Sequence, residues 1–352
     1  PYPEGVAAAE VLKVGNGVGG VEENRRGLAA ILGSSLVSAG YALLTQLKLV
    51  AAEATTTFRV GAGGTTVSAS LSMALIGVGH LVGLAVGIAM LVGLLISWGV
   101  LVPWLTAAAP AAAGTGLEDH VGAIFRSEVR FIGAGTIGVA AIWTLLKILG
   151  PITRGVASAI AASRARRSGG QDSLALTERD LPIGIIFGTI LLSMIPIGLL
   201  LYGFAQTGPI AADPGPTLGL SIGYILIVGV VIASVCGYMA GLIGASNSPI
   251  SGVGILAVLG ISLILAALFG GVTDQAGTQS LVAYALFVTA IVFGVATISN
   301  DNLQDLKTGQ LVGATPWRQQ VALVLGVLFG AVVIPPILDL LNTAFGFQGA
   351  PG

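Results

Sequence analysis

The sequence has almost none of the residues that build disulfides or metal centres. It contains one cysteine, Cys236, which cannot form a disulfide within the chain and whose apolar surroundings predict a small, packed side chain. Only two histidines occur, His80 and His120, and no Cys/His pair has the spacing of a metal site. We therefore expect no resident metal and no cofactor.

Charge is also scarce. Charged residues make up 9% of the 352 residues, and the formal net charge is −1. Without a basic surface, nucleic acid is excluded as a partner. The sequence has no Gly-x-x-x-x-Gly-Lys-Ser/Thr loop, so it does not bind nucleotide phosphates in that way. We expect no enzyme and no catalytic residue in this chain.

Most of the chain consists of apolar residues. They make up 55% of the chain, and the mean hydropathy is +0.95. Eight segments approach or exceed the ~20 residues that a membrane-spanning helix needs; they are residues 28–50, 67–105, 129–149, 183–204, 218–244, 253–269, 281–298 and 321–341. Alternating segments typical of a membrane barrel are absent. The sequence predicts an all-α, polytopic protein of the lipid bilayer, a helical bundle with broken or re-entrant helices.

Glycine is the most conspicuous residue, with 53 copies. Several glycines recur every four residues, and this spacing lets helix backbones approach closely within a membrane. The clearest cases are Gly79, Gly83 and Gly87, then Gly237 and Gly241, then Gly326 and Gly330.

The densest polar cluster, residues 300–309, lies between two apolar runs. Polar groups at such a place face protein or a water-filled cavity, and they are candidates for function. Asp301 and Asp305 would share one face of a helix, where two close carboxylates can hold a proton between them. The other interpretation is a solvated cytoplasmic loop, with Trp317 at the membrane interface.

A second polar segment, residues 244–252, lies between two apolar helices. Gly244 can end the first helix, while Ser248 suits the N-cap and Pro249 the first position of the next. The pattern predicts a broken helix whose N-terminal N–H groups attract an anion such as a peptide carboxylate. An ordinary Ser-Pro turn at the membrane surface is the alternative. The side chains that would contact a substrate are Ser246, Asn247, Ser248 and Ser251.

The third segment opens the chain. Two prolines within residues 1–5 predict a turn or re-entrant loop that leads into a helix, with Tyr2 and Glu4 facing the pathway. Glu10 and Lys13 are spaced to form an ion pair on that helix.

Basic residues indicate how the chain is divided. Residues 1–163 hold the first membrane helices and residues 183–345 the later ones, and the linker at 164–182 carries Arg164, Arg166 and Arg167, which places it in the cytoplasm. The N-terminal half fits this orientation if the apolar run 67–105 breaks near residues 77–80 into a short piece and a full helix. His80 lies at that break, and we expect a structural role for it rather than proton relay.

These three polar segments resemble the oligopeptide transporter family, which includes peptide carriers and yellow-stripe-like metal-chelate carriers. The matching stretches are residues 1–5 with 9–13, 244–252, and 301–309 continuing through 311–317. The resemblance implies a secondary transporter, often proton-driven, for short peptides or peptide-like metal chelates. Members are longer, so we expect this chain to be a fragment.

The sequence therefore predicts a proton-coupled symporter in a bacterial or archaeal plasma membrane. Its substrate would contact Tyr2, Glu4 and the 246–251 segment, together with Asn302, Gln304 and Lys307 on the third segment. Asp301, Asp305 or Glu4 would carry the proton. The alternatives are a passive channel for small polar solutes and an intramembrane hydrolase that uses Ser246 or Ser248 with His80. Neither the oligomeric state nor the choice between peptide and chelate follows from the sequence.

Overall fold

The computed structural model describes residues 2–16, 21–112, 114–169, 175–206, 208–272 and 274–346. Helices make up nearly all of these ranges, and eight helical stretches within them are long and apolar enough to cross a membrane. The predicted all-α, polytopic membrane fold is confirmed.

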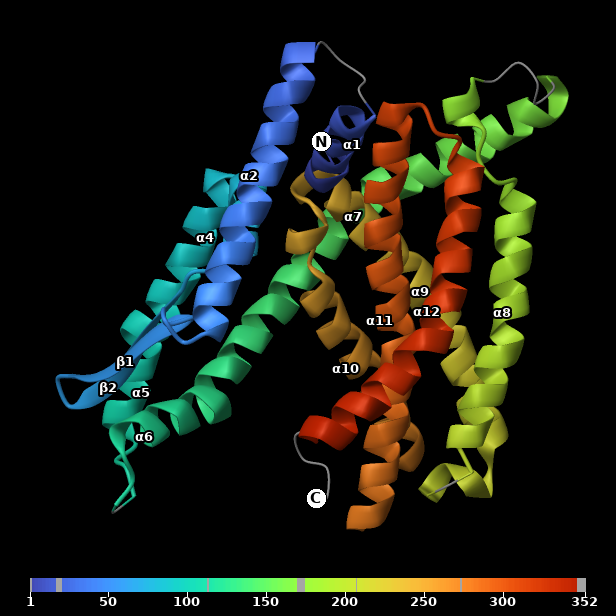
Figure 1. Ribbon diagram of the computed structural model, residues 1–352. Coiled ribbons are helices and arrows are strands. Elements are labelled where there is room, and N and C mark those ends of the chain that lie inside the picture. The colour runs from blue at the N-terminus through green and yellow to red at the C-terminus, as the bar shows by residue number, and fades with distance from the viewer. Residues whose placement is uncertain are drawn as a thin grey trace.

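The later helices form a bundle on one side of the molecule (Figure 1). Its elements are α8 (Ile183–Phe204), η5 (Gly208–Ala212), α9 (Pro214–Ile243), η6 (Ala245–Asn247), α10 (Ile250–Phe269), α11 (Gln275–Val312) and α12 (Pro316–Phe345). The main core lies between α9, α10 and α11, where Ile261, Val288 and Val292 are buried. Cys236 belongs to this core, as its apolar surroundings predict.

The earlier elements form a second group on the other side (Figure 1). They are α1 (Pro3–Gly15), α2 (Val21–Gln46), β1 (Glu53–Val60), β2 (Gly63–Ser70), α3 (Met73–Val82), α4 (Leu84–Leu94), η1 (Leu95–Leu101), α5 (Val102–Ala108), α6 (Leu117–Ile124) and η2 (Phe125–Val129). The long α7 (Arg130–Gly169) then runs obliquely from this group to the far end of the bundle. α1 connects the two groups, because it packs against α11 of the bundle as well as against α2 and α3.

A β-hairpin occupies the first part of the apolar run 67–105. β1 and β2 pair antiparallel across the two-residue turn between Val60 and Gly63. Both strands contain consecutive threonines, residues 55–57 on β1 and 65–66 on β2, which are β-branched and favour extended backbone. The Gly64 amide donates to Thr106 Oγ1 at 2.9 Å, which fixes the hairpin on α5. The prediction of a helix from residue 67 is therefore wrong up to Ser72, since α3 begins at Met73.

The remainder of that run divides into a short helix and a long one, as predicted. The break is at Gly83, three residues beyond His80, where φ is 88° and α3 gives way to α4. α3 is too short to span a bilayer, whereas residues 84–108 are long enough. His80 lies exposed in the last turn of α3.

Two boundaries differ from the prediction near polar sequence. Residues 300–309 do not interrupt a helix, since α11 continues through them to Val312. Likewise α7 continues to Gly169, into the segment predicted as a linker, and the side chains of Arg164, Arg166 and Arg167 lie outside the described residues. The Trp317 amide donates to the Arg179 carbonyl oxygen at 3.2 Å, so the end of the linker and the α11–α12 turn lie together. This contact agrees with placing both on one side of the membrane.

Candidate functional site

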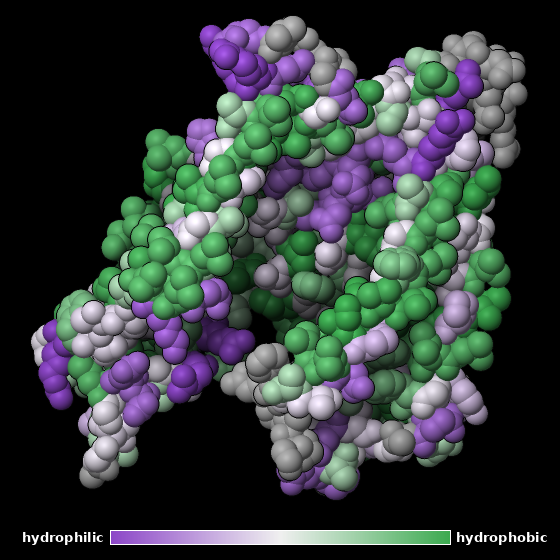
Figure 2. Space-filling view, in the orientation of Figure 1, coloured by the Kyte–Doolittle hydropathy of each residue, from purple (hydrophilic) through white to green (hydrophobic). Residues whose placement is uncertain are grey.

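The three polar segments of the sequence meet in the structure. Residues 2–5 at the start of α1, residues 240–248 around the end of α9, and residues 300–308 of α11 contact one another at the upper end of the bundle (Figure 1). We call this place the polar junction. Figure 2 shows hydrophilic surface gathered near α1 and the upper part of α11, with apolar surface along the helices below it.

Gln304 joins the three segments through its side-chain amide. Its Oε1 atom accepts a hydrogen bond from the Gly5 amide at 2.8 Å, and its Nε2 atom donates to the Ala240 carbonyl oxygen at 2.8 Å. Thr308 Oγ1 adds a hydrogen bond to the Gly5 carbonyl oxygen at 3.0 Å. Because Gln304 is 6% exposed and both ends of its amide are engaged, its role here is to position α1 and α9 rather than to offer a free contact.

Glycines allow this close approach. A Cβ atom at Gly5 would lie 2.6 Å from the Gln304 carbonyl oxygen, and one at Gly241 would lie 2.9 Å from the ring of Tyr2. The Tyr2 amide also donates to the Gly241 carbonyl oxygen at 2.9 Å. Of the three glycine series noted in the sequence, the one at Gly237 and Gly241 lies at a helix contact, whereas Gly79, Gly83 and Gly87 face open space.

The predicted broken helix is present between α9 and α10. Gly244 ends α9 at φ 90° and ψ 160°, a backbone conformation that glycine alone adopts readily. Pro249, not Ser248, is the N-cap of α10, and the helix begins at Ile250, one residue later than predicted. The reason is that the Pro249 carbonyl oxygen is the first to accept a helical hydrogen bond, from the Val253 amide at 3.0 Å.

Glu4 reaches into this break from α1. Its Oε1 atom accepts a hydrogen bond from the Ser246 amide at 3.2 Å, and its carboxylate fills the space where a Cβ atom of Gly244 would lie. Asn300 on α11 also contacts the break, since its Nδ2 atom donates to the Ala245 carbonyl oxygen at 3.0 Å. The Glu4 carboxylate thus occupies the position that the sequence analysis predicts for the carboxylate of a substrate.

The other predicted site residues on α11 lie around the junction. Asp301 and Asp305 are exposed and Asn302 is half-buried. Lys307 Nζ donates to Gln310 Oε1 at 2.9 Å, and no ion pair joins this lysine to Asp301 or Asp305 in the described structure. The two carboxylates are therefore open to a proton or to a substrate.

The predicted site residues on α10 and in the break differ in their exposure and in the contacts that they make. Ser251 is exposed in the first turn of α10, and Ser248 is half-buried in the break. The side chain of Asn247 lies outside the described residues. Ser246 contributes its backbone amide to Glu4, and the residue itself is exposed.

Three residues that hold the polar junction together are not predicted as site residues from the sequence. Asn300, Thr308 and Gly5 belong to the polar segments, but their roles depend on partners roughly 55 to 300 residues away. The one signal in the sequence is the run of side chains with amide or hydroxyl groups on a single helix face, at positions 300, 304 and 308.

The structure gives the hydrolase alternative no support. No hydrogen bond joins His80 to Ser246 or Ser248 within the described ranges. A Gly-x-Ser-x-Gly pattern does occur at residues 219–223, but it lies inside α9 rather than on a sharp strand-to-helix turn. Its Ser221 is 1% exposed and accepts a hydrogen bond from Tyr284 at 3.0 Å.

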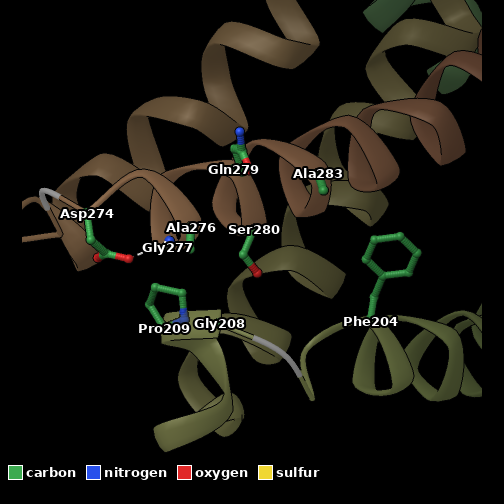
Figure 3. A pocket seen from close by; sticks show the side chains of 9 residues that line it. All are labelled: Phe204, Gly208, Pro209, Asp274, Ala276, Gly277, Gln279, Ser280 and Ala283. Carbon is green, nitrogen blue, oxygen red and sulfur yellow. Dashed lines mark hydrogen bonds between the residues drawn. The ribbon is translucent and has the colours of Figure 1, made fainter. Parts of the chain in front are cut away.

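A cavity of about 680 Å³ (Figure 3) lies where α11 begins, at the end of the bundle opposite the polar junction (Figure 1). Phe204, Pro209 and Ala283 form much of its wall, and Asp274 is its charged residue. Asp274 already accepts a hydrogen bond from the Gly277 amide at 2.8 Å, which caps α11. Gln279 and Ser280 are the other polar side chains of the lining. None of these residues belongs to the three polar segments of the sequence, and the polar junction remains the candidate site.

Comparison with known proteins adds to this geometry. The model of the family described as OPT oligopeptide transporter protein matches residues 1–352. A protein of Haemophilus influenzae named "Putative oligopeptide transporter" is 40% identical over 355 residues, which cover 99% of this chain and 55% of that protein. The chain thus spans about half the length of this relative. No solved structure matches the chain.

Proposed function

Because the chain belongs to the OPT oligopeptide transporter family, we propose that it works as a secondary active transporter of short oligopeptides or peptide-like metal chelates. The bacterial relative supports a plasma membrane location. The three motifs that resemble the family meet at the polar junction, and this convergence is the observation that carries the proposal.

The broken helix explains why this place suits transport. Unwound backbone and helix ends inside a membrane protein expose N–H and carbonyl groups that can bind a substrate and release it again. In the described structure Glu4 covers the exposed amide of Ser246. A substrate carboxylate would have to displace Glu4 to reach that amide, so α1 would act as a movable part of the site.

The exposed acids near the junction support proton coupling as part of this proposal. Asp301 and Asp305 lie one helical turn apart on α11, without a basic partner in the described structure. Carboxylates can bind and release a proton during transport. We propose Asp301, Asp305 or Glu4 as the acid that binds a proton with the substrate.

The test is uptake by the full-length protein in proteoliposomes. Labelled dipeptides and tripeptides are supplied with and without an inward proton gradient, and empty vesicles are the control. We expect accumulation above the outside concentration only with the gradient. Equilibration without accumulation would favour a passive channel instead, and the absence of any peptide uptake would favour chelates as substrates.

A further inference from the structure

Three buried oxygen atoms at the polar junction have no hydrogen-bond partner within the described structure. One is the Ser248 hydroxyl, which can donate as well as accept. The other two are the carboxylate oxygen Glu4 Oε2 and the amide oxygen Asn300 Oδ1, which are acceptors. Buried polar atoms nearly always have a partner, and an unsatisfied one indicates a bound water, ion or ligand. These two acceptors therefore require a partner that the described side chains do not supply.

Both side chains are hydrogen-bonded to neighbouring residues of the break between α9 and α10. Glu4 is anchored through Oε1 on the Ser246 amide, and Asn300 through Nδ2 on the carbonyl oxygen of the preceding residue, Ala245. The orientation of the Asn300 amide is fixed by this contact, because turning it over would set its oxygen against the Ala245 carbonyl oxygen. Asn300 is only 1% exposed, so its Oδ1 atom points into protein and not into solvent.

The missing partner must donate hydrogen bonds or carry positive charge, since Glu4 Oε2 and Asn300 Oδ1 are both acceptors. Glu4 forms no ion pair with a lysine or arginine in the described part of the chain. α9 also ends at this break, and the carbonyl end of a helix carries partial negative charge. The negative charge of Glu4 is thus uncompensated by any described side chain.

The available ligands favour a small, hard cation. Carboxylate, amide and carbonyl oxygens bind such ions, and unwound helices in transporters hold Na⁺ through groups of this kind. No group of three His, Cys, Asp or Glu side chains suited to a metal ion occurs among the described residues. A transition metal is accordingly a poor match.

We propose that Glu4 Oε2, Asn300 Oδ1 and the carbonyl end of α9 bind a monovalent cation. The cation is either Na⁺ or the ammonium group at the N-terminus of a peptide. The inference deepens the proposed function, and it rests on that function only where the cation belongs to the peptide. It also reverses the prediction from sequence: with Glu4 docked, the break attracts a positive group instead of a carboxylate.

Binding of radioactive sodium to the purified full-length protein tests whether the cation is Na⁺. Scintillation proximity counts are recorded without peptide, against choline at constant ionic strength. We expect saturable binding by the unaltered protein. Outer-sphere substitutions weaken metal binding by about 10- to 100-fold, and loss of the direct ligand in Glu4→Gln should weaken it at least as much.

Two variants serve as comparisons. Glu10→Gln removes an exposed carboxylate of the same helix, one that pairs with Lys13, and should bind sodium normally. Glu4→Asp keeps the charge but shortens the side chain, and it should bind more weakly without losing binding. Each variant is first shown to be monodisperse by gel filtration. If Glu4→Gln does not fold, Glu4→Asp against Glu10→Gln provides the test.

A labelled tripeptide and its N-acetylated form test whether the cation is the ammonium group of a peptide. Acetylation removes the positive charge, so it should weaken binding in the unaltered protein and have no effect in Glu4→Gln. Sodium binding that depends on Glu4, or an acetylation effect that depends on Glu4, supports the proposal. The proposal would be overturned if Glu4→Gln changed neither the sodium affinity nor the acetylation effect, or if no protein showed either effect. Sodium binding is measured without peptide, so its outcome is independent of whether peptide uptake is observed.

Discussion

Replacing Gly5 with alanine is expected to abolish peptide uptake and to lower the melting temperature of the protein. The added Cβ atom would lie 2.6 Å from the Gln304 carbonyl oxygen and 3.2 Å from Lys307 Cβ. A backbone atom of a long helix cannot move aside as the tip of a flexible side chain can. Overpacking of this kind costs about 1–3 kcal/mol, and here it would also separate α1 from α11.

Gly15→Ala is the matched control for this variant. Gly15 lies on the same helix, and a Cβ atom there would meet nothing within 4 Å. Alanine favours helix over glycine by about 0.8–1.0 kcal/mol, so Gly15→Ala should be neutral or slightly stabilising. Thermal unfolding and proteoliposome uptake are measured for both. If Gly5→Ala matched Gly15→Ala in both assays, the close packing of α1 on α11 would have no part in function.

Asp305→Asn is expected to remove uptake driven by a proton gradient while exchange of internal for external peptide continues. The substitution keeps the size of the side chain but removes its capacity to bind and release a proton. The Asp305 carbonyl oxygen, which accepts a hydrogen bond from Gln319 Nε2 at 3.0 Å, belongs to the backbone and is unaffected. A purely structural role would impair exchange and gradient-driven uptake alike.

Asp339→Asn provides the comparison for Asp305→Asn. Asp339 is an exposed carboxylate near the other end of α12, outside the polar junction. Its replacement should leave both transport modes intact. Gradient-driven uptake that persisted in Asp305→Asn would remove this residue as the coupling acid and leave Asp301 and Glu4.

The sequence predicts the membrane helices well because a span needs a long apolar run. α8 coincides with the predicted segment 183–204, and the break after α9 follows from Gly244 and Pro249. The hairpin at residues 53–70 is not predicted, because most of it lies between two apolar runs and its consecutive threonines do not give the alternation that marks a half-buried strand. Its position depends on contacts with α5 that no local pattern records.

The polar junction could be predicted only in part. The three segments are visible as polar runs, but the pairing of Gly5 with Gln304 joins residues at opposite ends of the chain. The continuous helix through residues 300–309 also contradicts the local polarity, and it is possible because Asn300 and Gln304 satisfy the backbone of neighbouring segments. Local sequence indicates which residues are unusual, and tertiary contacts decide what they do.

Protection of Ser246→Cys from a hydrophilic maleimide tests most directly whether substrate binds at the polar junction. Ser246 is exposed at the break, and the native Cys236 is fully buried, so background labelling should be low. Thr343→Cys, exposed near the far end of α12, reports general effects on reactivity. We predict that saturating peptide slows labelling of Ser246→Cys and leaves Thr343→Cys unchanged. Equal labelling of Ser246→Cys with and without peptide, in protein shown to transport that peptide, would contradict the account.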